Sequence, residues 1–242
     1  MPEATEHRLI DEILSRLPSL AGKGDLVKRI TATLTEEIIS GSLPADSQLT
    51  SVELGKRFQT SRTPIREALF VLQQEGLVDI EARKRPHVST LDNKDIRDLY
   101  SIRANLYSLV AEQIVRDASI DDVNLLLPSL QGMQDALSSH DVGSFFVASV
   151  QFRNVEASIC QNHWVGTMIE SLGLRVYRLR RFGLSLPGRL NEAWQDHYHL
   201  YQAYVERDED LARAIAKSLV WRALRAIEAN IGSPDVTVGK YH

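Results

Sequence analysis

The chain has 242 residues, 43% of them hydrophobic, and a formal net charge of −4 at pH 7. This length suits two domains of ordinary size. The negative charge argues against a protein that coats nucleic acid indiscriminately, because such proteins carry a large positive excess. No apolar run is long enough to span a bilayer and no secretory signal is recognised, so we expect a cytoplasmic protein.

The first 24 residues are predicted to form an arm or an extra helix. Apolar residues recur there at the spacing of one helix face. They are Leu9, Ile10, Ile13, Leu14 and Leu17. The pattern stops at Pro18, and Gly-Lys-Gly at residues 22–24 is typical of a hinge.

Residues 25–91 follow the order helix, helix, helix, hairpin. The first predicted helix covers about residues 25–40. Thr50, followed three residues later by Glu53, forms a capping box that opens a short second helix, and the third covers about residues 61–75. The predicted hairpin strands are residues 77–81 and 87–90. This order predicts a winged helix-turn-helix domain.

Residues 92–232 show helical patterns only, which predicts an antiparallel bundle of six or seven helices. The expected helices are residues 93–117, 120–138, 141–159, 162–184, 188–206 and 208–230. Residues 233–242 are predicted to be a flexible tail. The fold class is therefore mainly α, with an N-terminal winged helix-turn-helix domain ahead of the bundle.

The start of the third helix carries the residues best suited to reading DNA. Arg62 and Arg66 are four residues apart and share one helix face, at the end that a helix-turn-helix inserts into the major groove. The planar fork of arginine can donate to O6 and N7 of guanine together. The hydroxyls of Ser61 and Thr63, with the N–H groups of the helix start, favour a phosphate.

The basic hairpin tip strengthens this interpretation, because it could reach the adjacent backbone or minor groove. Taken alone, the two arginines of the helix could merely solvate an exposed face. Between a two-helix lead-in and a basic hairpin, DNA binding is the better interpretation. The predicted DNA-binding residues are Thr50, Ser61, Arg62, Thr63, Arg66, Arg83, Lys84 and Arg85.

Residues 25–90 resemble the N-terminal domain of the GntR family. The resemblance rests on Ile-Ile-Ser-Gly-Ser-Leu-Pro at 38–44, Ser-Arg-Thr-Pro-Ile-Arg-Glu-Ala-Leu at 61–69 and Leu-Gln-Gln-Glu-Gly-Leu-Val at 72–78. It implies base or phosphate contacts from Arg62, Thr63 and Arg66, and symmetric dimers on short palindromic operators. Two features depart from the family pattern: Pro44-Ala45-Asp46-Ser47 replaces Pro-Gly-acid-base, and the wing tip lacks glycines.

The helical remainder resembles the FCD type of GntR effector domain, through residues 98–106, 197–200 and 208–212. Many relatives hold a divalent metal there with an Asp and a His one helical turn apart and two later histidines. The matching positions here are Ser149, Arg153, His197 and Leu219. A lone histidine beside a guanidinium is a poor cation site, so we predict neither a metal nor another cofactor.

Arg153 stands where the positive charge of the metal would lie, which suggests that it anchors an anionic effector with a carboxylate or phosphate. By resemblance, Arg103 points into the same cavity, and His197 or, after a shift of the alignment, His199 completes it. The predicted effector-binding residues are Arg103, Ser149, Arg153, Arg178, His197 and Leu219.

Plainer interpretations stay open for the same residues. Arg153 could pair with Glu156, and His197 could be a solvated histidine beside Asp196. Arg178 belongs to a basic series whose members share a helix face and could be solvated or face a dimer partner; they are Arg175, Arg178 and Arg181.

No catalytic motif is recognised, and the single cysteine, Cys160, is interpreted as a buried side chain, so we do not expect an enzyme. The sequence predicts a homodimeric transcriptional regulator that binds double-stranded DNA, acting as a repressor released by a small anionic metabolite. The alternatives are a helical protein-interaction module and a ligand-independent regulator, both using the winged helix as a scaffold.

Overall fold

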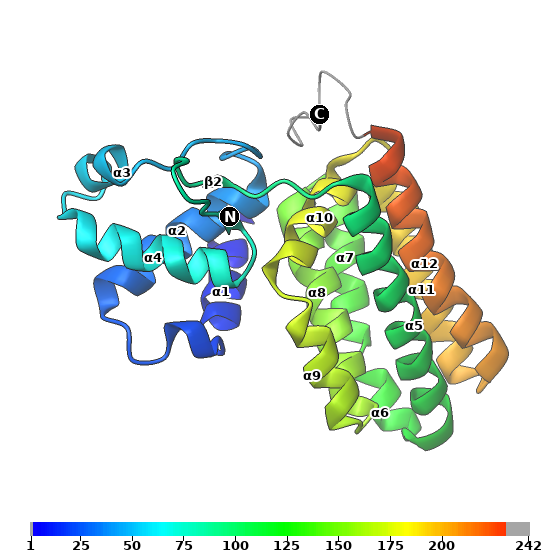
Figure 1. Ribbon diagram of the computed structural model, residues 1–242. Helices are drawn as coiled ribbons and strands as arrows, with labels where there is room; N and C mark the ends of the chain where they lie inside the picture. Colours follow the sequence, from blue (N-terminus) through cyan, green and yellow to red (C-terminus); the bar gives the residue numbers. More distant parts are fainter. Residues whose placement is uncertain (1, 231–242) are drawn as a thin grey trace. The chain divides into compact units, whose positions relative to one another are not determined.

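The computed structural model describes residues 2–230, which form helices and one small sheet (Figure 1). The mainly α fold class is confirmed. The described chain divides into two compact units: one combines residues 6–92 with residues 173–182, and the other combines residues 93–172 with residues 183–229. The tail predicted for residues 233–242 lies outside the described residues.

The first unit contains the predicted winged helix-turn-helix. Its helices are α1 (Pro2–Ser15), the 3-10 helix η1 (Pro18–Leu20), α2 (Asp25–Ser40), α3 (Ser51–Arg57) and α4 (Arg62–Gln74). Leu34 and Ile38 of α2 and Ile65 of α4 are fully buried, and α2 and α4 pack against each other. This packing leaves the opposite face of α4 exposed.

The extra N-terminal helix is present as α1, and its apolar face is buried at Leu9, Ile10 and Leu14. The imidazole of His7 lies on its polar side, with Nδ1 3.0 Å from Oε1 of Glu36 on α2. A helix of fourteen residues is marginal by itself in water, so its stability comes from this packing.

The wing is a two-stranded antiparallel sheet of β1 (Val78–Asp79) and β2 (His87–Val88), shorter than predicted. The sequence missed a further segment beside β2. Residues 46–49, for which no strand was predicted, exchange backbone hydrogen bonds with residues 86–88, including Val88 N to Ser47 O at 2.9 Å. The strand pattern was hard to recognise because this segment pairs for only a few residues.

The second unit is the predicted bundle. Its helices are α5 (Asn93–Asp117), α6 (Ile120–Asn124), α7 (Leu127–Ser138), α8 (Val142–Ile159), α9 (His163–Ser171), α11 (Arg189–Val205) and α12 (Glu209–Asn230). Helix α8 runs through the core, with Phe145, Phe146 and Phe152 fully buried. No helix among residues 2–230 is both long and apolar enough to cross a membrane.

Two helices expected to be continuous are each broken, so those predictions were wrong. The stretch 120–138 divides into α6 and α7 because Pro128 lies in the first turn of α7 and has no N–H to continue a helix from α6. The stretch 162–184 divides into α9 and α10 (Leu174–Ser185) at Gly173, whose φ is +70°. Most of α10 belongs to the first unit.

Candidate DNA-binding and effector sites

The turn between α3 and α4 fixes where the recognition helix begins. Gln59 has φ +51°, and Thr60 N–H donates to the carbonyl of Gly55 at 2.9 Å. A Cβ atom at Gly55 would lie 3.1 Å from the Thr60 oxygen. A residue without a side chain therefore allows the end of this turn to lie close against α3.

The N-terminus of α4 is exposed at every predicted DNA-binding position, which are Ser61, Arg62, Thr63 and Arg66. The side chain of Ser61 does not cap the helix, so the first N–H groups of α4 remain available to an external acceptor such as a phosphate. Neither Arg62 nor Arg66 has a carboxylate partner among the described residues, whereas Arg57 on α3 pairs with Glu37. The recognition helix thus presents two uncommitted guanidiniums.

Thr50 differs from the other predicted DNA-binding residues because its hydroxyl is already engaged. It donates to Oε2 of Glu53 at 2.7 Å and accepts the Glu53 N–H at 3.3 Å. This contact stabilises the start of α3, as the capping pattern predicted. A DNA contact from Thr50 stays a prediction.

The wing tip exposes Arg83, Lys84 and Arg85, but they differ in their partners. Lys84 pairs with Glu81 at 2.7 Å, a contact that raises the pKa of Lys84 and lowers that of Glu81. Arg85 donates to Oε1 of Gln48 at 2.9 Å. Arg83, at φ +66°, has no hydrogen-bond or ion-pair partner among the described residues, so it is the most available of the three for a phosphate.

In the bundle, Arg153 forms a buried ion pair. Its side chain is 4% exposed, and Nη1 lies 2.7 Å from Oε2 of Glu156, one turn later on α8. The hydroxyl of Tyr204 donates to Oε1 of Glu156 at 2.6 Å. Burial and the nearby carboxylate raise the pKa of Tyr204 well above its ordinary value, so this hydroxyl stays protonated as a donor. Both oxygens of Glu156 are therefore occupied.

Arg103 of α5 belongs to the same cluster, because its guanidinium and that of Arg153 both lie over the ring of Tyr107, at 5.8 and 4.2 Å from the ring centre. The guanidinium of Arg103 also lies 4.6 Å from the ring centre of Tyr100. Arg103 is 5% exposed and has no carboxylate partner among the described residues. Nη1 of Arg103 and Nη2 of Arg153 are buried without an acceptor there. The structure thus brings the two predicted effector arginines together.

The remaining predicted positions do not resemble a cation site. Ser149 is buried and donates to the carbonyl of Phe146 at 2.7 Å. His197 is buried, its ring 5.0 Å from that of Phe152, and Leu219 is half-buried on α12. Residues 2–230 contain no group of three or more His, Cys, Asp and Glu side chains that could hold a metal. With a guanidinium at position 153, the residues present do not fit the metal that the family pattern implies.

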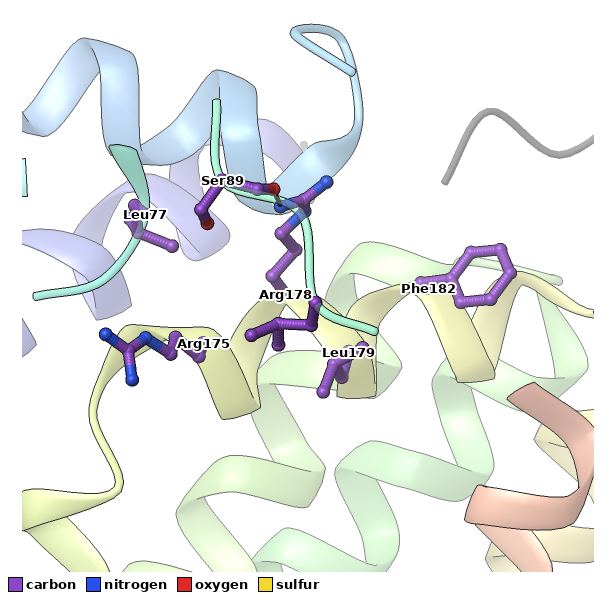
Figure 2. Close-up of a pocket in the computed structure, with 7 residues that line it drawn as sticks. Leu77, Ser89, Arg175, Arg178, Leu179 and Phe182 are labelled. Atoms are coloured by element: carbon purple, nitrogen blue, oxygen red, sulfur yellow. Dashed lines mark hydrogen bonds between the residues drawn. The ribbon is translucent and has the colours of Figure 1, made fainter. Parts of the chain in front are cut away.

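Arg178 does not lie with the other predicted effector residues. Its Nη1 donates to the carbonyl of Ser89 at 2.6 Å, and it lines a small pocket of the first unit with Leu77 and Leu179 (Figure 2). Its neighbours on the same face of α10 behave alike: Arg175 bonds the carbonyl of Gly76, and Arg181 bonds Glu6. These contacts join residues nearly a hundred or more positions apart, which helical spacing alone does not reveal.

Known proteins share both parts of this chain. The model of “Bacterial regulatory proteins, gntR family” matches residues 26–88, and that of the FCD domain matches residues 98–221. The chain belongs to the GntR family. GntR-family proteins with an FCD domain are DNA-binding transcriptional regulators and not enzymes.

Two curated relatives of this GntR-family chain are repressors. The gluconate operon transcriptional repressor of Bacillus licheniformis is 31% identical over 192 residues, which cover 76% of this chain and 77% of the relative. The HTH-type transcriptional repressor RspR of Escherichia coli (strain K12) is 24% identical, covering 79% of this chain and 85% of the relative. The solved structure of E. coli McbR/YncC shares the fold, with a TM-score of 0.69, 18% identity and coverage of 86% of this chain and 99% of that one.

The sequence interpretation missed the aromatic side chains of the buried cluster. Tyr107 follows Arg103 by four residues and Tyr204 follows His197 by seven, spacings that keep each pair on one helix face. This periodicity is the available signal. By itself it does not distinguish a ligand contact from core packing, because aromatic residues on a bundle helix commonly pack in the core.

Proposed function

We propose that this regulator is a homodimeric repressor that reads a short palindromic operator with α4 and leaves it when a small anionic metabolite binds the bundle. The exposed Arg62 and Arg66 at the uncapped start of α4 carry the DNA-reading part. The paired, buried guanidiniums of Arg103 and Arg153 carry the effector part.

The DNA-reading part is tested by selecting bound sequences from a random DNA pool. Wild type should recover a palindrome, because two copies related by a two-fold axis read equivalent half-sites. The double variant Arg62→Ala/Arg66→Ala should recover none, while Arg57→Ala, which removes an arginine already paired with Glu37, should still recover it. Equal enrichment by all three proteins would contradict base reading by α4.

The effector part follows from the cost of burying charge. A buried cation without a partner destabilises a protein by several kcal/mol, and natural proteins place such groups mainly where function requires them. An anionic ligand could accept hydrogen bonds from Nη1 of Arg103 and Nη2 of Arg153, which lack an acceptor among the described residues. Its negative charge would balance that of the Arg103 guanidinium. Because a named relative represses a gluconate operon, sugar acids are suitable first probes.

The variant Arg103→Met tests this site, because it keeps much of the side-chain volume and removes the charge. We expect the ligand-free variant to be as stable as wild type or more stable, yet to lose stabilisation by sugar acids in a thermal shift assay. Arg116→Met, which removes an exposed arginine from the same helix, should retain that stabilisation. Unchanged sugar-acid binding by Arg103→Met would refute an anion site at this position.

Release from DNA would follow if the effector favours a spacing of the two DNA-binding units that mismatches the operator. The measurement is operator affinity with and without a ligand that stabilises the bundle. A ligand that binds at Arg103 but leaves operator affinity unchanged would retain the effector site and exclude this mechanism of release.

A further inference from the structure

Residues Arg103, Tyr107, Arg153, Glu156 and Tyr204 form a buried group, the arginine cluster, that contains one carboxylate. Glu156 is fully buried, and its two oxygens accept from Nη1 of Arg153 and from the Tyr204 hydroxyl. The family pattern for the metal positions does not include this glutamate. It is therefore a feature of this site that the proposed anion anchor does not explain.

The charges of the cluster can be counted from its contacts. Glu156 compensates Arg153, since the two form an ion pair at 2.7 Å. Arg103 has no carboxylate partner among the described residues. The nearest acidic neighbour of His197 along the chain, Asp196, is engaged elsewhere, with Oδ1 2.6 Å from Nη1 of Arg222. One positive charge, that of Arg103, remains uncompensated.

His197 does not change this count in its neutral form. Its Nδ1 lies 2.6 Å from the carbonyl oxygen of Ala193, which can only accept, so Nδ1 carries a proton. In this neutral form His197 adds no positive charge to the count.

We propose that the cluster selects an effector with a single negative charge, a monocarboxylate, and that Glu156 is the residue that excludes dianions. This proposal rests on the anionic effector site proposed above and specifies its ligand. Arg103 compensates one carboxylate, and Nη2 of Arg153 offers it a second donor across the shared ring of Tyr107. Among the described residues of this cluster, a second carboxylate would find no further cation without a carboxylate partner, and it would be brought close to the buried carboxylate of Glu156.

The test uses matched pairs of carboxylates that differ by one charge: gluconate with glucarate, and butyrate with succinate. Thermal shift and titration calorimetry are run up to tens of millimolar at constant ionic strength and neutral pH. For wild type, the dicarboxylate of any pair that binds should bind at least about tenfold more weakly than the monocarboxylate, because its second charge would be brought close to the buried carboxylate of Glu156.

Glu156→Gln should remove this preference or reverse it, because it deletes the buried negative charge at nearly constant volume. Glu209→Gln makes the same change in net charge at an exposed pair with Arg116 and should keep the wild-type preference. If Glu156→Gln does not fold, the comparison of each pair on wild type still decides whether the site prefers monocarboxylates to dicarboxylates.

The outcomes separate the two proposals. If no anion, inorganic phosphate included, binds in a manner that depends on Arg103, the anionic effector site itself is wrong and this inference fails with it. If phosphate binds through Arg103 and no carboxylate does, the effector site stands and the monocarboxylate assignment is refuted. If carboxylates bind through Arg103 but the dicarboxylate of a pair binds as tightly as its partner, the effector site stands and charge selection by Glu156 is refuted.

Discussion

Gly76 ends the recognition helix in a position that a side chain should not tolerate. Its φ is +71°, and a Cβ atom there would lie 1.6 Å from Nε of Arg175. In Gly76→Ala the left-handed backbone costs about 1–2 kcal/mol. Displacing the arginine would break its 3.2 Å hydrogen bond to the Gly76 carbonyl, a loss of about 0.5–1.5 kcal/mol. We expect a total destabilisation of roughly 2–3 kcal/mol.

Gly22→Ala is the matched control for this substitution. Gly22 lies in the same unit with φ +72°, and nothing lies within 4 Å of its would-be Cβ. It should therefore show the backbone cost alone. In an Arg175→Ala background, Gly76→Ala should likewise fall to the cost of Gly22→Ala, since the side chain that obstructs Cβ is gone.

Hydrogen–deuterium exchange is the suitable assay. The tryptophans lie at positions 164, 194 and 221, all in the bundle, so their fluorescence does not report on the DNA-binding unit. Exchange of the amides of α4 gives the opening free energy of that unit directly. Equal losses of protection in Gly76→Ala and Gly22→Ala would show that Arg175 does not restrict this site.

Three further predictions concern DNA reading and pH. Arg66→Ala should weaken operator binding by about 1–3 kcal/mol and relax the sequence preference at one base pair, whereas Lys84→Ala should weaken binding to all DNA sequences alike. Equal losses of affinity for operator and random DNA in a binding titration of Arg66→Ala would contradict base reading. Asp141→Ala should destabilise the bundle by about 1 kcal/mol, because its carboxylate caps α8 by accepting the N–H of Ser144 at 3.0 Å. Burial opposes the charge of Asp141, but the capping hydrogen bonds outweigh it and lower the pKa of this carboxyl group. In urea denaturation, wild type should be more stable than Asp141→Ala above the ordinary carboxyl pKa, and this extra stability should be lost as the pH falls through the lowered pKa. A difference in unfolding free energy that stays constant down to acid pH would refute the cap. The hydrogen bond to Glu36 raises the pKa of His7. The extra stability over His7→Gln should therefore be complete below the ordinary histidine pKa and lost as the pH rises through the raised one. It should amount to only a few tenths of a kcal/mol because the imidazole is half exposed, and exchange protection of α1 that is independent of pH would contradict it.

The parts of the fold that the sequence predicted correctly are those encoded by neighbouring residues. The capping pair Thr50 and Glu53 and the helix face shared by Arg62 and Arg66 depend on spacings of three or four residues, and the structure has both. For Arg153, local spacing supported both an effector anchor and a pair with Glu156. The structure shows the pair, and the anchor stays a proposal.

What the sequence did not predict depends on contacts between distant segments or on a single residue that breaks a helix. Arg178 was a candidate for the effector cavity, beside the alternatives of a solvated or dimer-facing side chain. In the structure it bonds the carbonyl of Ser89, 89 residues away, and an effector role stays a prediction. Backbone carbonyls have no sequence signature. Gly173 marks the break between α9 and α10, but a single glycine inside a helical pattern does not by itself predict the end of a helix.

The hydrogen bonds from α10 decide whether the winged helix-turn-helix domain can be separated from the rest of the chain without loss of contacts. A fragment that ends at residue 92 would keep every residue of the winged helix. It would, however, leave the carbonyls of Gly76 and Ser89 without their arginine donors and would lack Leu179, which lines a pocket together with Leu77. We expect the same loss when residues 6–92 of this chain are fused to the effector domain of another protein. The DNA-binding unit of this protein therefore keeps its internal contacts in another protein only when residues 173–182 are transferred together with residues 6–92.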